Sequence, residues 1–242
     1  MGKIDIASAK EEVDFALDVA RKRKKTLLGY INQIESSLNK GNFNDYAKAL
    51  YGEGTQDRQL FRKIHDYFGW KAKDSRSVRG GCSGSLYRST SFLLIPKELR
   101  VGSRKTQNIH IEHVIPINLI PKLIWSNRHN LNNSEDIFNS LMKYSICAGL
   151  AISDKAQVDR SRKIEGKLMN WRNNHPSILV EGENAYIVDD RPFARYIGSG
   201  IEVFSIIDEE NINFERFTFS DHMRMVASYA SLNWCSYKVD QT

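Results

Sequence analysis

A glutamate and a histidine stand side by side near the middle of the chain, in Glu112-His113-Val114-Ile115-Pro116. A carboxylate can bind a divalent cation, and the neighbouring imidazole can take a proton from water near neutral pH. Together these two groups suit metal-assisted hydrolysis of a phosphodiester. The apolar residues around the pair predict a strand that Pro116 closes, because proline removes a donor from the ladder. The run therefore points to a nucleic acid as substrate.

Length and charge fit that chemistry without requiring it. The chain has 242 residues, of which 41% are hydrophobic and 26% charged, and its formal net charge is +6. This length suits one large domain or two small ones with a real core, and the ordinary charged fraction excludes a disordered chain. A basic excess of this size is common among nucleic-acid-binding proteins, but it also occurs in basic proteins with other roles.

The three cysteines, Cys82, Cys147 and Cys235, are far apart and form no Cys-x-x-Cys pair. Neither a structural zinc nor a disulfide scaffold is expected, and each cysteine is expected to be a small buried apolar residue. No apolar run approaches the roughly 20 residues that span a membrane, and no signal-peptide core is present. The sequence predicts a cytoplasmic protein without a membrane segment.

The N-terminal third has helical periodicity. One long helix is predicted over 8–40 with Ser8 as its N-cap, followed by helices over 43–50 and 56–68. These elements predict a helical subdomain over 1–70. The five consecutive cations at 21–25 are either a solvated helix face or a contact with backbone phosphates.

Residues 71–108 are predicted to be a basic loop and connector rich in glycine, serine and arginine. The segment is either a flexible connector or a loop that becomes ordered on DNA, with arginines reaching phosphates or guanine edges. The cations involved are Lys71, Lys73, Arg76, Arg79, Arg88, Arg100, Arg104 and Lys105.

The middle of the chain predicts two strands followed by a helix. The first strand covers 109–115 and the second 146–152, and a helix capped by Ser153 runs to about Trp171. With this order, Ile-Glu-His-Val-Ile-Pro resembles the first strand of the HNH, or ββα-metal, nucleases. The resemblance covers about 45 residues and implies an α+β fold: a ββα-metal core over 109–172 in a mostly helical protein, completed by an α/β part over 173–242.

The resemblance implies that Glu112 binds one Mg²⁺ or Mn²⁺ ion and that His113 is the general base. Neighbouring side chains of a strand point to opposite faces, so the two groups can share a site only if the strand twists or ends there. The family places a further ligand, Asn or His, in the first turn or two of the helix, but residues 153–160 contain neither. Gln157 is favoured by its position, Asp159 is the rival with the more usual oxygen for Mg²⁺, and Asn139 is the ligand if the ββα unit is shorter.

Three further sets of polar residues lie near the motif in the sequence. The family's middle asparagine, which orders the loop, corresponds to one of Asn127, Asn130, Asn132 and Asn133. His110 shares a strand face with Glu112 and either touches the metal or a phosphate, or is an ordinary strand histidine. Downstream, Arg195 either holds a phosphate or forms a structural ion pair while Phe193 and Tyr196 occupy the core.

The sequence thus predicts a metal-dependent endonuclease of double-stranded DNA, with a type II restriction enzyme as the favoured form. Arg76, Arg79, Arg104, Lys105 and Arg195 are its predicted DNA contacts. Cleavage of both strands of a palindrome implies a homodimer. A homing, phage or non-specific HNH nuclease is the alternative within the class. A non-catalytic DNA-binding protein with a degenerate site is the alternative from another class, because the helix lacks the family's ligand.

Overall fold

The fold is α+β, as predicted. A computed structural model describes residues 4–51, 59–68, 84–100, 107–160, 162–164, 167–169 and 173–230. Its α-helices are α1 (Ile6–Lys22), α2 (Lys24–Leu38), α3 (Phe43–Tyr51), α4 (Gln59–Phe68), α5 (Thr90–Leu93), α6 (Ile120–Ser126), α7 (Ser134–Tyr144), α8 (Ile152–Asp159) and α9 (Phe219–Ala230). Three short 3₁₀ helices, η2 (Lys97–Leu99), η3 (Arg128–Asn130) and η4 (Ala194–Tyr196), lie between them.

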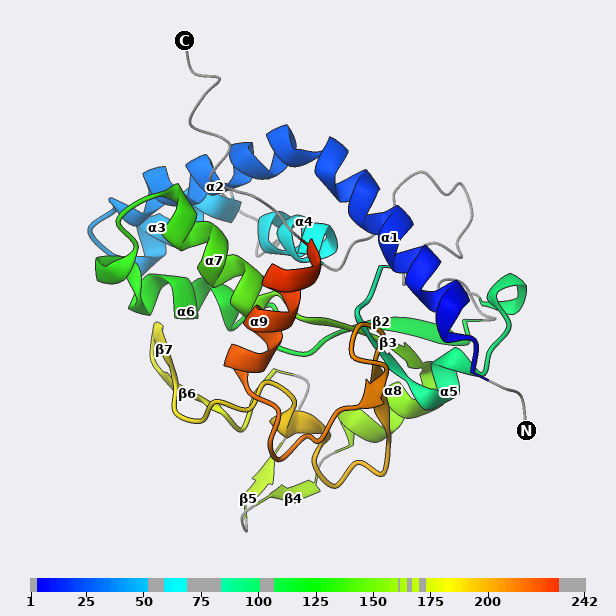
Figure 1. Cartoon of the computed structure of the whole chain (residues 1–242). Helices are drawn as coiled ribbons and strands as arrows, with labels where there is room; N and C mark the ends of the chain where they lie inside the picture. The colour runs from blue at the N-terminus through cyan, green and yellow to red at the C-terminus, as the bar shows by residue number, and fades with distance from the viewer. Residues whose placement is uncertain are drawn as a thin grey trace.

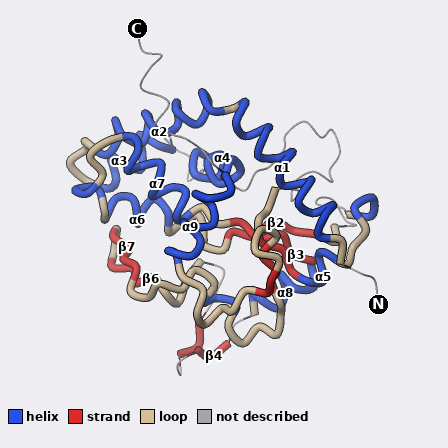
Figure 2. The backbone as a smooth tube through the Cα atoms, in the orientation of Figure 1, coloured by secondary structure: helices blue, strands red, loops and turns tan. Residues whose placement is uncertain are grey.

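The strands form one larger sheet and two hairpins (Figure 2). The sheet contains β1 (Tyr87–Ser89), β2 (Ile109–His113), β3 (Cys147–Ala151), β8 (Val203–Ser205) and β9 (Glu210–Asn211) in the spatial order β2-β3-β1-β8-β9. β4 (Arg162–Ile164) pairs with β5 (Lys167–Met169), and β6 (Ile178–Glu181) pairs with β7 (Asn184–Ile187). No helix in the described ranges is long and apolar enough to cross a membrane.

The predicted long N-terminal helix is two helices. Figure 1 shows α1 and α2 running one after the other along the top of the molecule. Arg23 ends α1 with φ −100° and ψ 12°, and its N–H is bonded to the carbonyls of Ala20 and Arg21. Five cations in little more than one turn repel one another, which favours a break at this point. The N-cap of α1 is Asp5, which accepts from the N–H of Ser8, rather than Ser8 itself.

Part of the predicted connector lies at the centre of the sheet. β1 pairs in parallel with β3 and antiparallel with β8, so the described end of the 71–108 segment is a structural strand. Arg88, predicted as one of the loop cations, is fully buried on this strand and forms an ion pair with Glu12 of α1. Arg100 binds the same carboxylate at 3.1 Å. Arg88 is therefore unavailable to DNA in this structure, and Arg100 is mostly buried.

One continuous hydrophobic core joins the N-terminal helices to the sheet. α2 contacts α3, α4 and also α7, which belongs to the middle of the chain. The ion pairs of Glu12 add a polar link between α1 and β1. The predicted boundary at residue 70 therefore does not separate two cores.

The ββα segment has the predicted order of elements but different limits. β2 pairs antiparallel with β3, and α8 follows β3 directly and contacts both strands. α8 starts at Ile152, before the predicted cap Ser153, because other parts of the chain bind its first N–H groups. Ser89 Oγ accepts from Ala151 N, and the Asn108 carbonyl accepts from Ile152 N. α8 ends at Asp159, well short of Trp171, because the next residue is extended.

The burial of Glu12 gives the first testable prediction. Glu12→Gln leaves the buried guanidinium of Arg88 without a charged partner, so we expect a loss of about 3 kcal/mol in the free energy of unfolding. The matched control is Glu11→Gln, one residue away on the exposed face of α1, which should change stability by less than about 0.5 kcal/mol. Urea denaturation of both variants measures the difference. Equal effects would show that the buried pair does not stabilise the fold.

Candidate functional site around Glu112 and His113

The register of β2 and β3 sets the directions of the two motif side chains. Glu112 lies opposite Ala148, and His113 lies opposite Cys147. Because side chains alternate along a strand, Glu112 shares one face with His110, whereas His113 points toward the other. β2 ends at His113, two residues before the predicted end at Ile115. The histidine is thus the last residue of the strand, and its side chain is half-buried.

The glycine at position 149 keeps the opposite face of this strand pair closely packed. A Cβ atom at Gly149 would lie 3.3 Å from the ring of Phe92, which comes from α5. Gly149 pairs with Ile111, the strand neighbour of Glu112. α5 therefore covers the face of the sheet that lies away from the Glu112 carboxylate.

Glu112 is a buried, ionised carboxylate. Its side chain is only 9% exposed, and its Oε1 accepts from Arg195 Nη1 at 3.1 Å. On the other side, Oε2 lies 3.5 Å from Nε2 of His110. Burial by itself raises the pKa of Glu112, but the contact with His110 and the electrostatic interactions with Arg195, His110 and His113 outweigh it. The net effect is a pKa below the ordinary value, so the carboxylate is anionic at neutral pH.

Arg195 lies in the interior, where its side chain is 2% exposed. Besides Glu112, its Nη1 donates to the carbonyl oxygens of His113 at 3.0 Å and Val114 at 3.3 Å. Of the two predicted roles for Arg195, a phosphate contact and a structural ion pair, the structure shows the ion pair. A guanidinium at this depth does not reach a DNA phosphate. Phe193 and Tyr196 are fully buried, as that role for Arg195 predicts.

An aromatic cluster fixes the short helix η4 that carries Arg195. The ring of Phe193 lies 4.9 Å from that of Tyr87 and 5.4 Å from that of Tyr196. Phe214 contacts both Phe193 and Tyr196. These contacts join η4 to β1 and to the segment before α9, so the arginine is presented by a rigid support.

α8 brings a second carboxylate to the same guanidinium. Asp159 Oδ1 lies 3.9 Å from Arg195 Nη2, and Asp159 also forms an ion pair with Lys155 one turn earlier. Residues two apart on a helix point roughly 160° away from each other, so Gln157 and Asp159 cannot face the same ion. The structure places Asp159 next to the Glu112–Arg195 pair. Lys155 had no predicted role, although its spacing of four from Asp159 is typical of a helix ion pair.

The remaining predicted residues lie elsewhere or outside the described ranges. Asn139 is on the exposed side of α7. Asn130 donates to Asn127 within their own loop at 2.7 Å, and Asn133 caps α7. Arg76, Arg79, Arg104 and Lys105 fall outside the described residues. Across the part of the chain that is described, no group of three or more His, Cys, Asp or Glu side chains is arranged to hold a metal ion.

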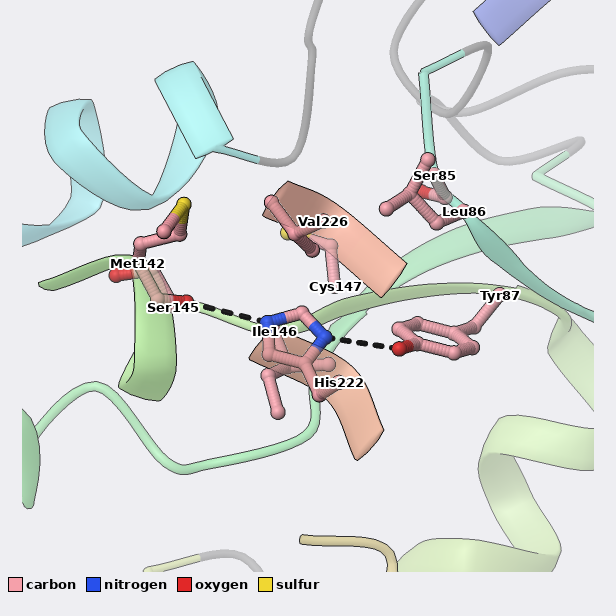
Figure 3. A pocket seen from close by; sticks show the side chains of 9 residues that line it. All are labelled: Ser85, Leu86, Tyr87, Met142, Ser145, Ile146, Cys147, His222 and Val226. Carbon is pink, nitrogen blue, oxygen red and sulfur yellow. Dashed lines mark hydrogen bonds between the residues drawn. The ribbon is translucent and has the colours of Figure 1, made fainter. Parts of the chain in front are cut away.

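Two buried histidines, His175 and His222, form hydrogen bonds in the interior. Figure 3 shows His222 of α9 between Tyr87 and the carbonyl of Met142; its Nδ1 lies 2.8 Å from the tyrosine hydroxyl and its Nε2 3.2 Å from the carbonyl. His222, Tyr87 and Met142 line a cavity of about 10 Å³, which has room for about one water molecule. His175 binds the carbonyl of Pro192 at 2.8 Å, shortly before Arg195.

No protein-family model, curated protein or solved structure matches this chain.

The two buried histidines predict a loss of stability in mild acid. Burial lowers the pKa of His175 to about 3 and that of His222 to about 4, so both stay neutral in the folded chain while the unfolded chain binds protons near pH 6.5. The stability they provide is therefore complete above that pH and is lost as the pH falls toward about 4. From pH 7 to 5 we expect about 2 kcal/mol of loss for each histidine.

Urea denaturation at the two pH values measures that loss. His222→Asn should reduce the loss by about half, and substitution of the exposed His129 by alanine should leave it unchanged. An undiminished loss in His222→Asn would contradict the assignment.

Two buried tyrosine hydroxyls differ in their partners and should differ in their energetics. The hydroxyl of Tyr196 is buried and has no hydrogen-bond partner among the described residues, whereas that of Tyr87 binds His222. We expect Tyr196→Phe to change the free energy of unfolding by less than about 0.5 kcal/mol and Tyr87→Phe to lower it by about 1–2 kcal/mol. Thermal unfolding of the pair measures this. The reverse order would mean that the Tyr196 hydroxyl has a partner in solution.

Proposed function

We propose that this protein is a DNA endonuclease of the HNH type, with the β2-β3-α8 segment as its ββα core. The observation that carries the proposal is the end of β2. There a buried anionic Glu112 is followed by a half-buried His113. Asp159 of α8 lies near the same place, 3.9 Å from the Arg195 guanidinium that binds Glu112. A site that concentrates carboxylates in a basic chain suits cation-assisted chemistry on a polyanion.

In this proposal His113 is the general base that takes a proton from the attacking water. Its side chain is half-buried at the end of β2, so water can approach it. Glu112 is too deeply buried to meet the substrate directly and serves as a fixed negative charge beside the base. This division of roles follows from strand geometry, which separates the two side chains.

The donor set fits a divalent cation in its chemistry. Glu112 Oε1 lies 3.1 Å from Arg195 Nη1 and Asp159 Oδ1 lies 3.9 Å from Nη2, so a divalent ion would share both carboxylates with the guanidinium. Mg²⁺ typically binds one or two carboxylates and completes its shell with water and substrate oxygens. When bound, the ion supplies positive charge for the scissile phosphate and the leaving oxygen. We therefore propose one Mg²⁺ or Mn²⁺ per site, with Glu112 and Asp159 as its ligands from this chain.

The proposed substrate is double-stranded DNA, and the proposed form is a sequence-specific restriction enzyme that acts as a homodimer. The net charge of +6 supports a polyanionic substrate. Arg76, Arg79, Arg104 and Lys105 stay the proposed DNA contacts, because they flank the motif in the sequence. Arg195 leaves this set, since its guanidinium is buried on Glu112.

Cleavage of supercoiled plasmid DNA tests the proposal. We expect nicking or linearisation in Mg²⁺ or Mn²⁺ and none in EDTA, and discrete fragments from a long DNA if cleavage is sequence-specific. His113→Ala should reduce the rate by at least about 100-fold, because a positioned general base contributes about 10²–10⁴-fold. DNA affinity measured in EDTA should stay within about threefold.

The matched control is His129→Ala, which removes an exposed loop imidazole and should cleave at the wild-type rate. Full activity of His113→Ala would show that another group is the base. If the wild-type protein binds DNA but cleaves no DNA or RNA in any cation, the non-catalytic DNA-binding alternative replaces the proposal.

A further inference from the structure

Arg195 binds the side chain of Glu112 and the main chain of the two residues that follow it, His113 and Val114. Through Nη1 it contacts Glu112 Oε1, the His113 carbonyl and the Val114 carbonyl, at distances of 3.0–3.3 Å. The three acceptors belong to consecutive residues, at the place where β2 ends and the base of the proposed reaction lies.

We propose that Arg195 is a positioning residue: it fixes the end of β2, and with it the direction of the His113 imidazole, without touching the substrate. This inference rests on the proposed function, in which His113 is the base. The strand end already has one hydrogen bond beyond His113, from the Val114 N–H to the Ile146 carbonyl at 3.0 Å. The guanidinium adds bonds to the carbonyls of His113 and Val114 and so fixes the two peptide groups that follow the His113 Cα atom.

The surroundings of Arg195 hold its side chain in place and keep it away from any ligand in solution. Its side chain is 2% exposed, and its backbone belongs to η4 between the buried rings of Phe193 and Tyr196. His175 holds the chain just before η4 through the carbonyl of Pro192. A misplacement of about 1 Å at a reacting group can lower a rate about 100-fold, so such a support has a direct catalytic consequence.

The role depends on the shape of the guanidinium as well as on its charge. Nη1 serves the strand end, while Nη2 lies 3.9 Å from Asp159 of α8. A lysine keeps the charge but has a single nitrogen on a flexible stem, so it cannot serve both groups in one fixed geometry. Arg195→Lys therefore separates positioning from charge.

The test compares Arg195→Lys with Arg88→Lys. Both arginines are buried and paired with a buried glutamate, but Arg88 pairs with Gly149 in the sheet register and lies on the face away from Glu112. With enzyme in excess over supercoiled plasmid and Mg²⁺ saturating, we expect Arg195→Lys to lower the single-turnover rate by about 100-fold. Its affinity for the plasmid in EDTA should stay within about threefold, and Arg88→Lys should keep both values within about threefold.

Three outcomes would overturn the inference. They are wild-type cleavage by Arg195→Lys, a loss of DNA affinity of tenfold or more that accounts for its lower rate, and an equal loss of rate in Arg88→Lys. If Arg195→Lys does not fold, Arg195→Gln, whose shorter side chain cannot serve the two carbonyls and Asp159 together, takes its place under the same criteria.

A second measurement separates this inference from the proposed function. If the wild-type protein cleaves nothing, the proposed function fails, but positioning is still tested by the NMR signals of the imidazoles. Arg195→Lys should shift the signals of His110 and His113 and leave that of His129 in place, whereas Arg88→Lys should shift none of the three. Unchanged His113 signals in Arg195→Lys would overturn the inference.

Discussion

The contact between Arg195 and Glu112 is the constraint on which the rest of the site depends. A carboxylate moved out of water needs a cation and hydrogen bonds in return, since an unpaired buried charge is strongly destabilising. The two residues are 83 positions apart, so the C-terminal part of the chain must be in place before Glu112 can be buried as an anion. The site is therefore a property of the whole fold, although its motif is only five residues long.

The same rule operates a second time at Glu12, on the opposite face of the sheet. There α1 supplies the buried carboxylate, and β1 supplies its arginine 76 residues later. The two pairs lie on opposite faces of the sheet, at β1 and at β2, which β3 separates, and they join the first and last thirds of the chain to the sheet. Long-range ion pairs of this kind favour one arrangement of elements over others, because a register shift would leave a charge unpaired.

Local pattern predicted some of the elements but not their partners. Hydrophobic runs and turn residues predicted strands over 109–115 and 146–152 and a helix from Ser153 to about Trp171, and the structure has β2, β3 and α8 there with different limits. The later part of the predicted helix contains the strands β4 and β5 instead. The start of α8 was not predicted, because Ser89 and the Asn108 carbonyl replace the helix cap that Ser153 was expected to provide. Arg88 shows the same limit: between glycines, serines and other cations it has the composition of a loop, and only its distant partner Glu12 makes it a buried strand residue.

Alternation along the strand also predicted that Glu112 and His113 point to opposite faces, which opposes a shared site. In the structure the two residues are connected in another way. A guanidinium can bind a side-chain carboxylate on one face and, with the same nitrogen, the main-chain carbonyls at the edge of the strand. Main-chain atoms belong to neither face, so fixing the carbonyl of His113 constrains an imidazole that points away from Arg195. An adjacent acid and base can thus be coupled through the backbone, without either side chain reaching the other.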